Sequence, residues 1–301
     1  MSSEPAGHSR AYWTYRGLSG LINVLPSRLL EPTAHLAGLS MSGLWRHKRP
    51  VIRANLRRVV GPGVSEAALD KLVIDAFNSY ARYWVEGARL TSMTPEEILE
   101  SFSIEGFEHV AEEVENHRGL ILALPHLGIW DLGGAWLTLK GCPMTTVAEA
   151  IEPPDLFEWF RAQREQLGLT IHELGPGTSG RLVTALRAGR LVGLVADRDI
   201  AGSGIDVEFF GERTTLPGGP ATLALRTGAH LFPSIVYQRS GLRGHGVILP
   251  ALEIERSGDL RADVTRVTQM LAHAFEGLIR RAPAQWHLFQ PNWPSDREKY
   301  R

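Results

Sequence analysis

Six short apolar segments in the second half of the chain constrain its fold more than any other feature of the sequence. They have the length and composition of buried strands, and they cover residues 119–125, 144–150, 169–175, 191–199, 229–237 and 246–254. Segments with helical spacing lie between or after them, at 130–139, 154–167, 179–189, 217–227 and 263–282. Strands that alternate with helices of roughly 10–15 residues are typical of a sheet covered by helices on both faces. The sequence therefore predicts an α/β core over residues 101–301, with a central, mostly parallel or mixed sheet.

The first 100 residues differ from this core and predict a helical portion. Between Glu31 and Glu66 there is no acidic residue, yet six basic residues lie there, at positions 46, 48, 49, 53, 57 and 58. Just upstream, residues 11–30 combine Tyr, Trp, Leu and Ile with arginine. An interfacial helix uses such a combination to bind an anionic membrane surface. A helical portion packed on the core, with a solvated basic face, explains the same residues equally well. Nucleic acid is disfavoured because no recognised motif accompanies the charge.

Composition indicates one intracellular domain over residues 1–301. The 44% hydrophobic content is ordinary for a globular protein, and there is no internal repeat or low-complexity linker. The single thiol, Cys142, excludes an intramolecular disulfide and a Cys-rich metal site, which fits a reducing cytosol. We expect neither a signal peptide nor a membrane span, because the N-terminus is polar and no stretch of 18 residues lacks charge.

One imidazole and one carboxylate interrupt the apolar stretch GLILALPHLGIWDLGGAWL at residues 119–137. His126 follows a buried strand, and catalytic groups collect at the carboxyl ends of strands in open α/β sheets. Side chains five residues apart on a helix diverge by about 140°. His126 can therefore meet Asp131 only through a turn, which Gly128 permits. In that case Asp131 would fix the imidazole tautomer and leave the other ring nitrogen as a base. The alternative is a buried, hydrogen-bonded histidine without a catalytic role.

A second polar cluster, Asp197-Arg198-Asp199, directly follows the apolar segment LVGLVA. Charges at the end of a buried strand are costly unless they are paired or functional, so an internal ion-pair turn is the alternative to a site. Arg164 lies on a predicted helix that could reach the same place. These acids and His126 could also hold a metal ion, but no second histidine has ligand-like spacing. The sequence contains no GxSxG, Walker or HExxH motif.

The sequence HLGIWD has the HxxxxD signature of glycerolipid-type acyltransferases, and the surrounding blocks resemble the bacterial lipid A biosynthesis acyltransferase family. The blocks keep the family's order and spacing from about residue 12 to 293; they are LALPHLGIWDLGGAWL, TVAE, REQLG, ADRD, DVEFFGE, LPGGPATLALRTGA and WHLFQPNW. The similarity is strongest to actinobacterial members that acylate phosphatidylinositol mannosides. One departure concerns Asp197, where those members have a glutamate.

The resemblance implies an enzyme on the cytosolic face of the plasma membrane. It would transfer a long acyl chain, typically palmitoyl, from acyl-CoA to a mannose 6-hydroxyl, and no metal or cofactor is expected. His126 would be the general base and Asp131 its orienting partner. Asp197 would share that task or hold the acceptor sugar. Substrate contacts are expected from five further residues: Glu149, Arg164, Arg198, Ser203 and Arg226.

The residues support this chemistry on physical grounds as well. A sugar hydroxyl needs a base at hydrogen-bond distance to become nucleophilic, and a thioester is already activated. We expect Arg198 to brace the acids beside it. We expect Trp130, Leu132, Trp136 and Leu137 to line an acyl groove, although core packing explains them as well. Three other functions remain open: acylation of another glycolipid such as a lipid A precursor, non-catalytic lipid binding, and metal-dependent hydrolysis.

Overall fold

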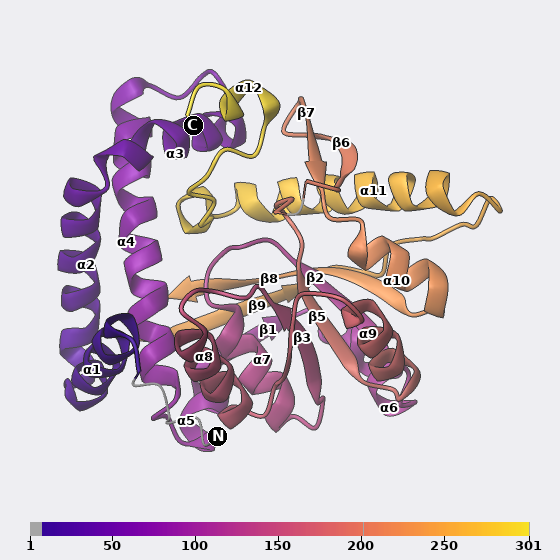
Figure 1. Cartoon of the computed structure of the whole chain (residues 1–301), viewed down its shortest axis with the longest axis horizontal. Helices are drawn as coiled ribbons and strands as arrows, with labels where there is room; N and C mark the ends of the chain where they lie inside the picture. The colour runs from indigo at the N-terminus through magenta and orange to yellow at the C-terminus, as the bar shows by residue number, and fades with distance from the viewer. Residues whose placement is uncertain (1–7, 201, 301) are drawn as a thin grey trace, which may run out of the picture.

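The computed structural model describes residues 8–200 and 202–300, so the prediction for residues 1–7 lies outside the described residues. Figure 1 shows a helical layer beside an α/β core, as the sequence predicts. The helical layer consists of α1 (Arg10–Val24), α2 (Ser27–Leu44), the 3-10 turn η1 (Arg46–Lys48), α3 (Arg49–Val60) and α4 (Glu66–Leu90). Pro50 lies in the first turn of α3, and Ser65 caps α4 by accepting from the Ala68 N–H.

The central sheet has seven strands in the order β1-β9-β8-β2-β5-β3-β4. All neighbouring pairs are parallel except β8 and β9, so the predicted mixed sheet is confirmed. The strands are β1 (Phe102–Glu105), β2 (Leu120–Leu124), β3 (Met144–Ala148), β4 (Thr170–Glu173), β5 (Leu191–Val195), β8 (His230–Arg239) and β9 (Arg243–Ile248).

Helices cover both faces of the sheet, and each face has its own apolar core. Helices α9 (Thr178–Arg187), α10 (Gly219–Thr227) and α11 (Leu260–Arg280) pack on one face. Helices α5 (Pro95–Glu100), α6 (Glu108–Glu115) and α7 (Trp130–Leu139) pack on the other, while α8 (Pro154–Gln166) lies beside β4. The remaining elements are the hairpin strands β6 (Ile205–Phe209) and β7 (Glu212–Leu216), the 3-10 turn η2 (Pro283–Gln285) and α12 (Pro294–Arg297).

The structure corrects three details of the strand prediction. The final strand ends at Ile248, well before residue 254, because Pro250 has no N–H to donate to a strand ladder. Strand β1 has only four residues, half of them polar, which gives little apolar signal. The β6–β7 hairpin packs on α11 rather than joining the main sheet.

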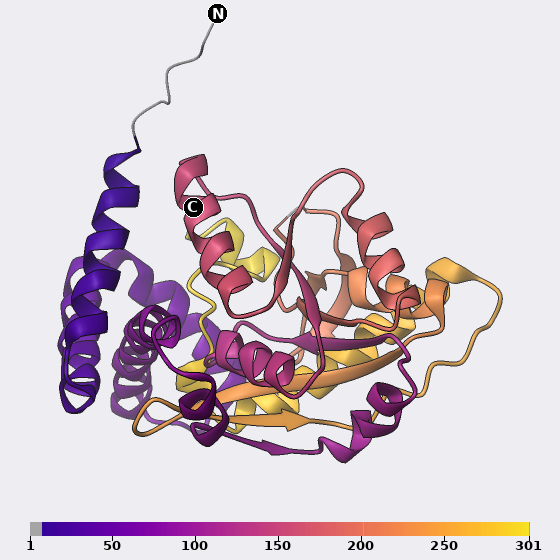
Figure 2. The ribbon, with the colours of Figure 1, turned by 90° about the horizontal axis from the view of Figure 1, so that it is seen from below.

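The outer surface of the helical layer carries unusually exposed apolar side chains. On α1 they include Trp13, Leu21 and Val24, with 57%, 58% and 77% of their surface exposed; α2 adds Leu36 at 66% and Leu44 at 79%. Within the described part of the chain, every helix is too short or too polar to cross a bilayer. An apolar patch of this kind marks an interaction surface. Figure 2 shows the layer standing at one side of the sheet.

Candidate active site

His126 lies in a tight turn between β2 and α7, at the carboxyl end of the sheet. Two other segments fix this turn: Gly128 N–H donates to the Gln285 carbonyl at 3.1 Å, and Ile129 N–H donates to the Val236 carbonyl at 3.1 Å. Gly128 has φ +68°, and a Cβ there would lie only 1.8 Å from the Val236 oxygen. Glycine is therefore required at this position.

Asp197 is the carboxylate that holds the His126 ring. Its Oδ1 lies 2.5 Å from His126 Nδ1, and its Oδ2 accepts from Trp286 Nε1 at 2.7 Å. Asp197 is completely buried, and burial acts to raise its pKa. The neighbouring imidazole and the hydrogen bonds from His126 and Trp286 outweigh burial and lower the pKa below its ordinary value. The side chain is therefore ionised at neutral pH and reaches His126 directly in spite of its short length.

The expected contact between Asp131 and His126 is wrong. Asp131 lies in the first turn of α7, where its carboxylate accepts from Arg164 Nε at 2.8 Å and from the Tyr83 hydroxyl at 3.1 Å. Because α7 begins at Trp130, the helix directs Asp131 toward α4 and α8. Asp131 also raises the pKa of Arg164 above its usual range, so this guanidinium stays charged. The HxxxxD signature thus supplies two polar groups that bind different partners.

The C-terminal segment 285–293 contributes polar groups to the site that were not among the expected site residues. Trp286 donates to Asp197, and Asn292 Nδ2 donates to the Asp197 carbonyl at 3.3 Å. The His287 backbone N–H donates to the His126 carbonyl at 2.7 Å. The block WHLFQPNW gave a signal for this role, because its polar groups have no partner within the block. Only the fold shows that they meet the strand end.

His287 is a neutral histidine beside the reactive one. Its ring packs against Tyr80 and Tyr83, with centroids 5.4 and 5.7 Å away. The Ser79 hydroxyl donates to Gln238 Oε1 at 2.8 Å, so it accepts from His287 Nε2–H at 2.9 Å. Burial, together with the field of His126, lowers the pKa of His287 to about 3.

The lowered pKa of His287 predicts that the folded state loses stability as the pH falls. Between pH 6.5 and about 3 the unfolded chain binds a proton at His287 that the folded chain does not, so this contribution to stability is present above pH 6.5 and lost as the pH falls. We expect His287→Gln to remove this slope. Between pH 7 and pH 5 the wild type should lose about 2 kcal/mol more unfolding free energy than the variant, measured by urea denaturation. Equal losses would contradict the assignment.

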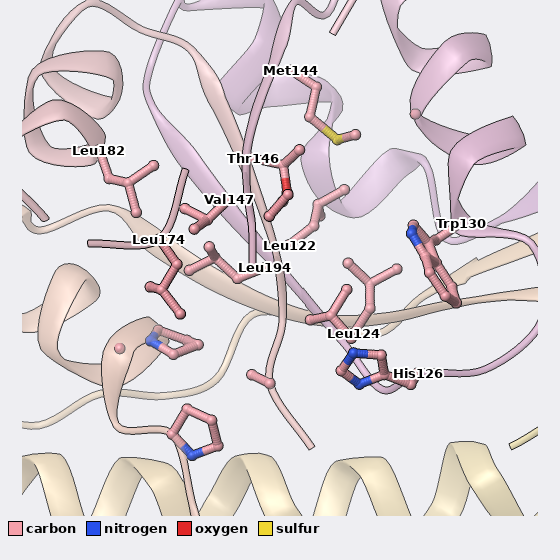
Figure 3. Close-up of a pocket in the computed structure, with 18 of the residues that line it drawn as sticks. Leu122, Leu124, His126, Trp130, Met144, Thr146, Val147, Leu174, Leu182 and Leu194 are labelled. Carbon is pink, nitrogen blue, oxygen red and sulfur yellow. The ribbon is translucent and has the colours of Figure 1, made fainter. Parts of the chain in front are cut away.

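A cavity of about 970 Å³ opens in front of His126 and extends along both faces of the sheet. We call the part between α7 and the sheet the deep arm; its lining includes Leu122, Gly133, Gly134, Leu137, Met144 and Thr146. The part beside α9 and α10 is the open arm; its lining includes Leu174, Thr178, Leu182, Ser203, Pro217 and Arg226. Figure 3 shows His126 and Trp130 on one side of this cavity, Met144 at the far end of the deep arm, and Leu174 and Leu182 in the open arm.

The sheet register explains the shape of the deep arm. Leu122, Gly193 and Thr146 lie side by side on β2, β5 and β3. Gly193 has no side chain of its own, and the Met144 side chain lies over it, since a Cβ on Gly193 would be only 2.9 Å from the Met144 sulfur. Met144 thus closes the deep arm at this level. Of the four residues expected to line an acyl groove, Trp130 and Leu137 do so. Leu132 and Trp136 pack in the core, and glycines 133 and 134 of α7 line the arm.

All five residues expected to contact substrate line the cavity; they are Glu149, Arg164, Arg198, Ser203 and Arg226. Arg198 does not brace its neighbouring acids. It lies 3.4 Å from Glu149 Oε2 and donates to Gln290 Oε1 at 3.2 Å. Asp199 instead accepts from the Gly202 and Gly204 N–H groups and shapes the glycine loop. No group of three or more potential metal ligands occurs within residues 8–200 and 202–300.

A buried carboxylate, an imidazole that opens on an apolar cavity and the HxxxxD turn define an enzyme of the acyltransferase class. The chain matches the family described as Bacterial lipid A biosynthesis acyltransferase over residues 4–295, and it belongs to that family.

Curated relatives agree with this assignment. The phosphatidylinositol mannoside acyltransferase of Mycolicibacterium smegmatis is 40% identical over 252 residues, which cover 81% of this chain and 79% of the relative. The protein of the same name from Mycobacterium tuberculosis is 40% identical over 259 residues, 83% of this chain and 79% of the relative. The lipid A biosynthesis acyltransferase of Haemophilus influenzae is 22% identical over 88% of this chain and 82% of its own length.

Proposed function

We propose that this acyltransferase transfers a long acyl chain, palmitoyl in the simplest case, from acyl-CoA to the 6-hydroxyl of a mannose in phosphatidylinositol mannosides. The observation that carries the proposal is the His126–Asp197 pair at the mouth of a cavity with a deep apolar arm. The names of the mycobacterial relatives support the acceptor class.

The chemistry requires one base and one good leaving group. Because Asp197 holds the Nδ1 proton of His126, the other ring nitrogen, Nε2, has a free lone pair. Nε2 removes the proton of the sugar hydroxyl while the oxygen attacks the thioester carbonyl. The C–O bond forms, the C–S bond breaks, and the proton on His126 passes to the departing CoA thiolate. Asp197 stabilises the transient imidazolium, so neither a metal nor a covalent enzyme intermediate is needed.

The two arms of the cavity suit the two parts of the donor. The deep arm is apolar, and burying roughly fifteen methylenes there contributes on the order of 10 kcal/mol to binding. The open arm carries Ser203 and Arg226, which can contact the polar groups of CoA. Glu149, Arg164 and Arg198 also line the cavity, and their charged groups would contact the acceptor sugar.

The depth of the deep arm should set the preferred acyl length, because Met144 closes it. We expect Met144→Ala to shift the preference toward longer chains by about tenfold, and Gly193→Val to shift it toward shorter ones. Competition between lauroyl-, palmitoyl- and stearoyl-CoA measures the shift. Leu182→Ala, in the open arm, is the matched control and should leave the preference unchanged. An unchanged preference in both deep-arm variants would place the acyl chain elsewhere.

We further propose that the protein acts as a peripheral enzyme on the cytosolic face of the plasma membrane. The exposed apolar residues of α1 and α2 support binding to a bilayer, and the exposed Arg46 and Arg49 just after α2 would favour an anionic one. Arg53, Arg57 and Arg58 pair with acids of this chain instead. The lipid acceptor resides in such a bilayer.

Product analysis tests the function directly. Purified protein is incubated with palmitoyl-CoA and mannosylated phosphatidylinositol, and mass spectrometry determines the chain attached and the sugar position. Acylation at the mannose 6-position that survives a chelator supports the proposal. Transfer only to a lipid A precursor would show that the acceptor belongs to another glycolipid class. Binding without turnover would indicate a lipid-binding relative. Loss of activity in the presence of a chelator would indicate a metal-dependent enzyme.

A further inference from the structure

A second, smaller cavity of about 130 Å³ lies between α1, α4 and α8. Its lining is mainly apolar and aromatic and includes Leu18, Ile22, Trp84, Leu90, Trp159 and Phe160. An apolar cavity of about 150 Å³ stays dry and accepts a hydrocarbon group as large as benzene. This space therefore has the size and chemistry for a short length of lipid chain.

Gly87, in the last turn of α4, lines this cavity without a side chain. A glycine on a helix leaves the space beside it free of a side chain, and what lies in that space differs from one helical glycine to another. Gly38 on α2 has a packing reason, because a Cβ there would lie 2.4 Å from Asn78 Oδ1. A Cβ on Gly87 would meet no atom within 4 Å, and Gly87 lines the second cavity. A larger side chain at Gly87 would therefore occupy the cavity without meeting protein atoms, and glycine keeps that space available for a ligand.

The second cavity connects two surfaces that matter for a lipid substrate. At its inner end it shares Asp131, Arg164, Trp84 and Phe160 with the main cavity. At its outer end is Leu18, which is 53% exposed. Leu18 belongs to the apolar surface of α1 that also carries Trp13, Leu21 and Val24.

We propose that the second cavity binds one hydrocarbon tail of the glycolipid acceptor. The tail would enter from the bilayer past Leu18 and lie against Gly87. The polar head group would then pass the Asp131–Arg164 pair, which separates the two cavities, and reach His126. The inference rests on the proposed acceptor class and adds a tail site to it.

The test compares Gly87→Leu, which fills the cavity, with Gly277→Leu. Gly277 is also helical, exposed and open to added atoms, but it lies on α11, outside both cavities. Each variant acylates mannosylated phosphatidylinositol and its deacylated, water-soluble form in detergent micelles, with palmitoyl-CoA as donor. We expect Gly87→Leu alone to raise KM for the lipid acceptor about tenfold, because each displaced methylene changes affinity about fourfold.

The KM values of Gly87→Leu for the deacylated acceptor and for palmitoyl-CoA should equal those of the wild type. An equal rise for both acceptors, no rise for either, or a rise for palmitoyl-CoA alone would overturn the tail site. If the wild type acylates neither acceptor, the proposed function fails, and the tail site is judged by photo-crosslinking alone.

The crosslinking probe is phosphatidylinositol with a diazirine in one chain. Adducts in residues 15–22, 84–91 and 159–167 that disappear in Gly87→Leu support the site. Adducts that persist in Gly87→Leu, or that lie only on the outer face of α1, overturn it.

Discussion

Asp197→Asn will lower kcat by about 10³-fold, close to the loss in His126→Ala, because both variants remove the base in its active tautomer. In Asp197→Asn the amide oxygen accepts from Trp286, and the amide NH2 faces His126 Nδ1. The imidazole then takes the Nε2–H form, which cannot accept the hydroxyl proton. Single-turnover transfer from palmitoyl-CoA at several pH values measures the effect.

Asp197→Glu keeps the charge and is the matched control. It should retain more activity than Asp197→Asn, although the added methylene crowds a completely buried site. Transfer by Asp197→Asn within tenfold of the wild type would show that this carboxylate does not set the tautomer.

Asp131→Ala will destabilise the fold by about 2–3 kcal/mol, because it leaves the Arg164 guanidinium without its counter-ion. Breaking a fully buried pair costs about 3–5 kcal/mol, and the smaller value reflects the 24% exposure of the Arg164 side chain. Urea denaturation measures the loss. Removing both charges, in Asp131→Asn with Arg164→Gln, should restore part of the stability.

Kinetic measurements distinguish the role of Asp131 from that of Asp197. Since Asp131 does not touch His126, Asp131→Asn should raise KM and leave the pH dependence of kcat unchanged. Asp197→Asn should alter that pH dependence. A shifted pH profile in Asp131→Asn would restore the original role of Asp131 as the partner of the base.

Some features of the fold could be predicted from the sequence, and others could not. The buried strands that end near residues 124 and 195 were predictable, because continuous apolar runs bounded by Pro or charge have few alternatives. Strand β1 and the β6–β7 hairpin were missed because short, half-polar strands lack such a signal. The acyl groove was predicted only in part, because Trp130 and Leu137 line the cavity whereas Leu132 and Trp136 pack in the core. The remaining residues of the deep arm come from separate strands, which only the sheet register brings together.

What the sequence determined by itself is the α/β class of the core, the helical N-terminal portion and the position of His126 at a strand end. These follow from local periodicity and turn chemistry, which act over a few residues. Only the tertiary structure decided which carboxylate serves the imidazole. Asp131 is five residues from His126 but faces Arg164, whereas Asp197 is 71 residues away and is brought into contact by parallel pairing of β2 with β5. The ends of neighbouring parallel strands meet at one edge of the sheet, so strand order, rather than distance along the chain, places the reacting groups.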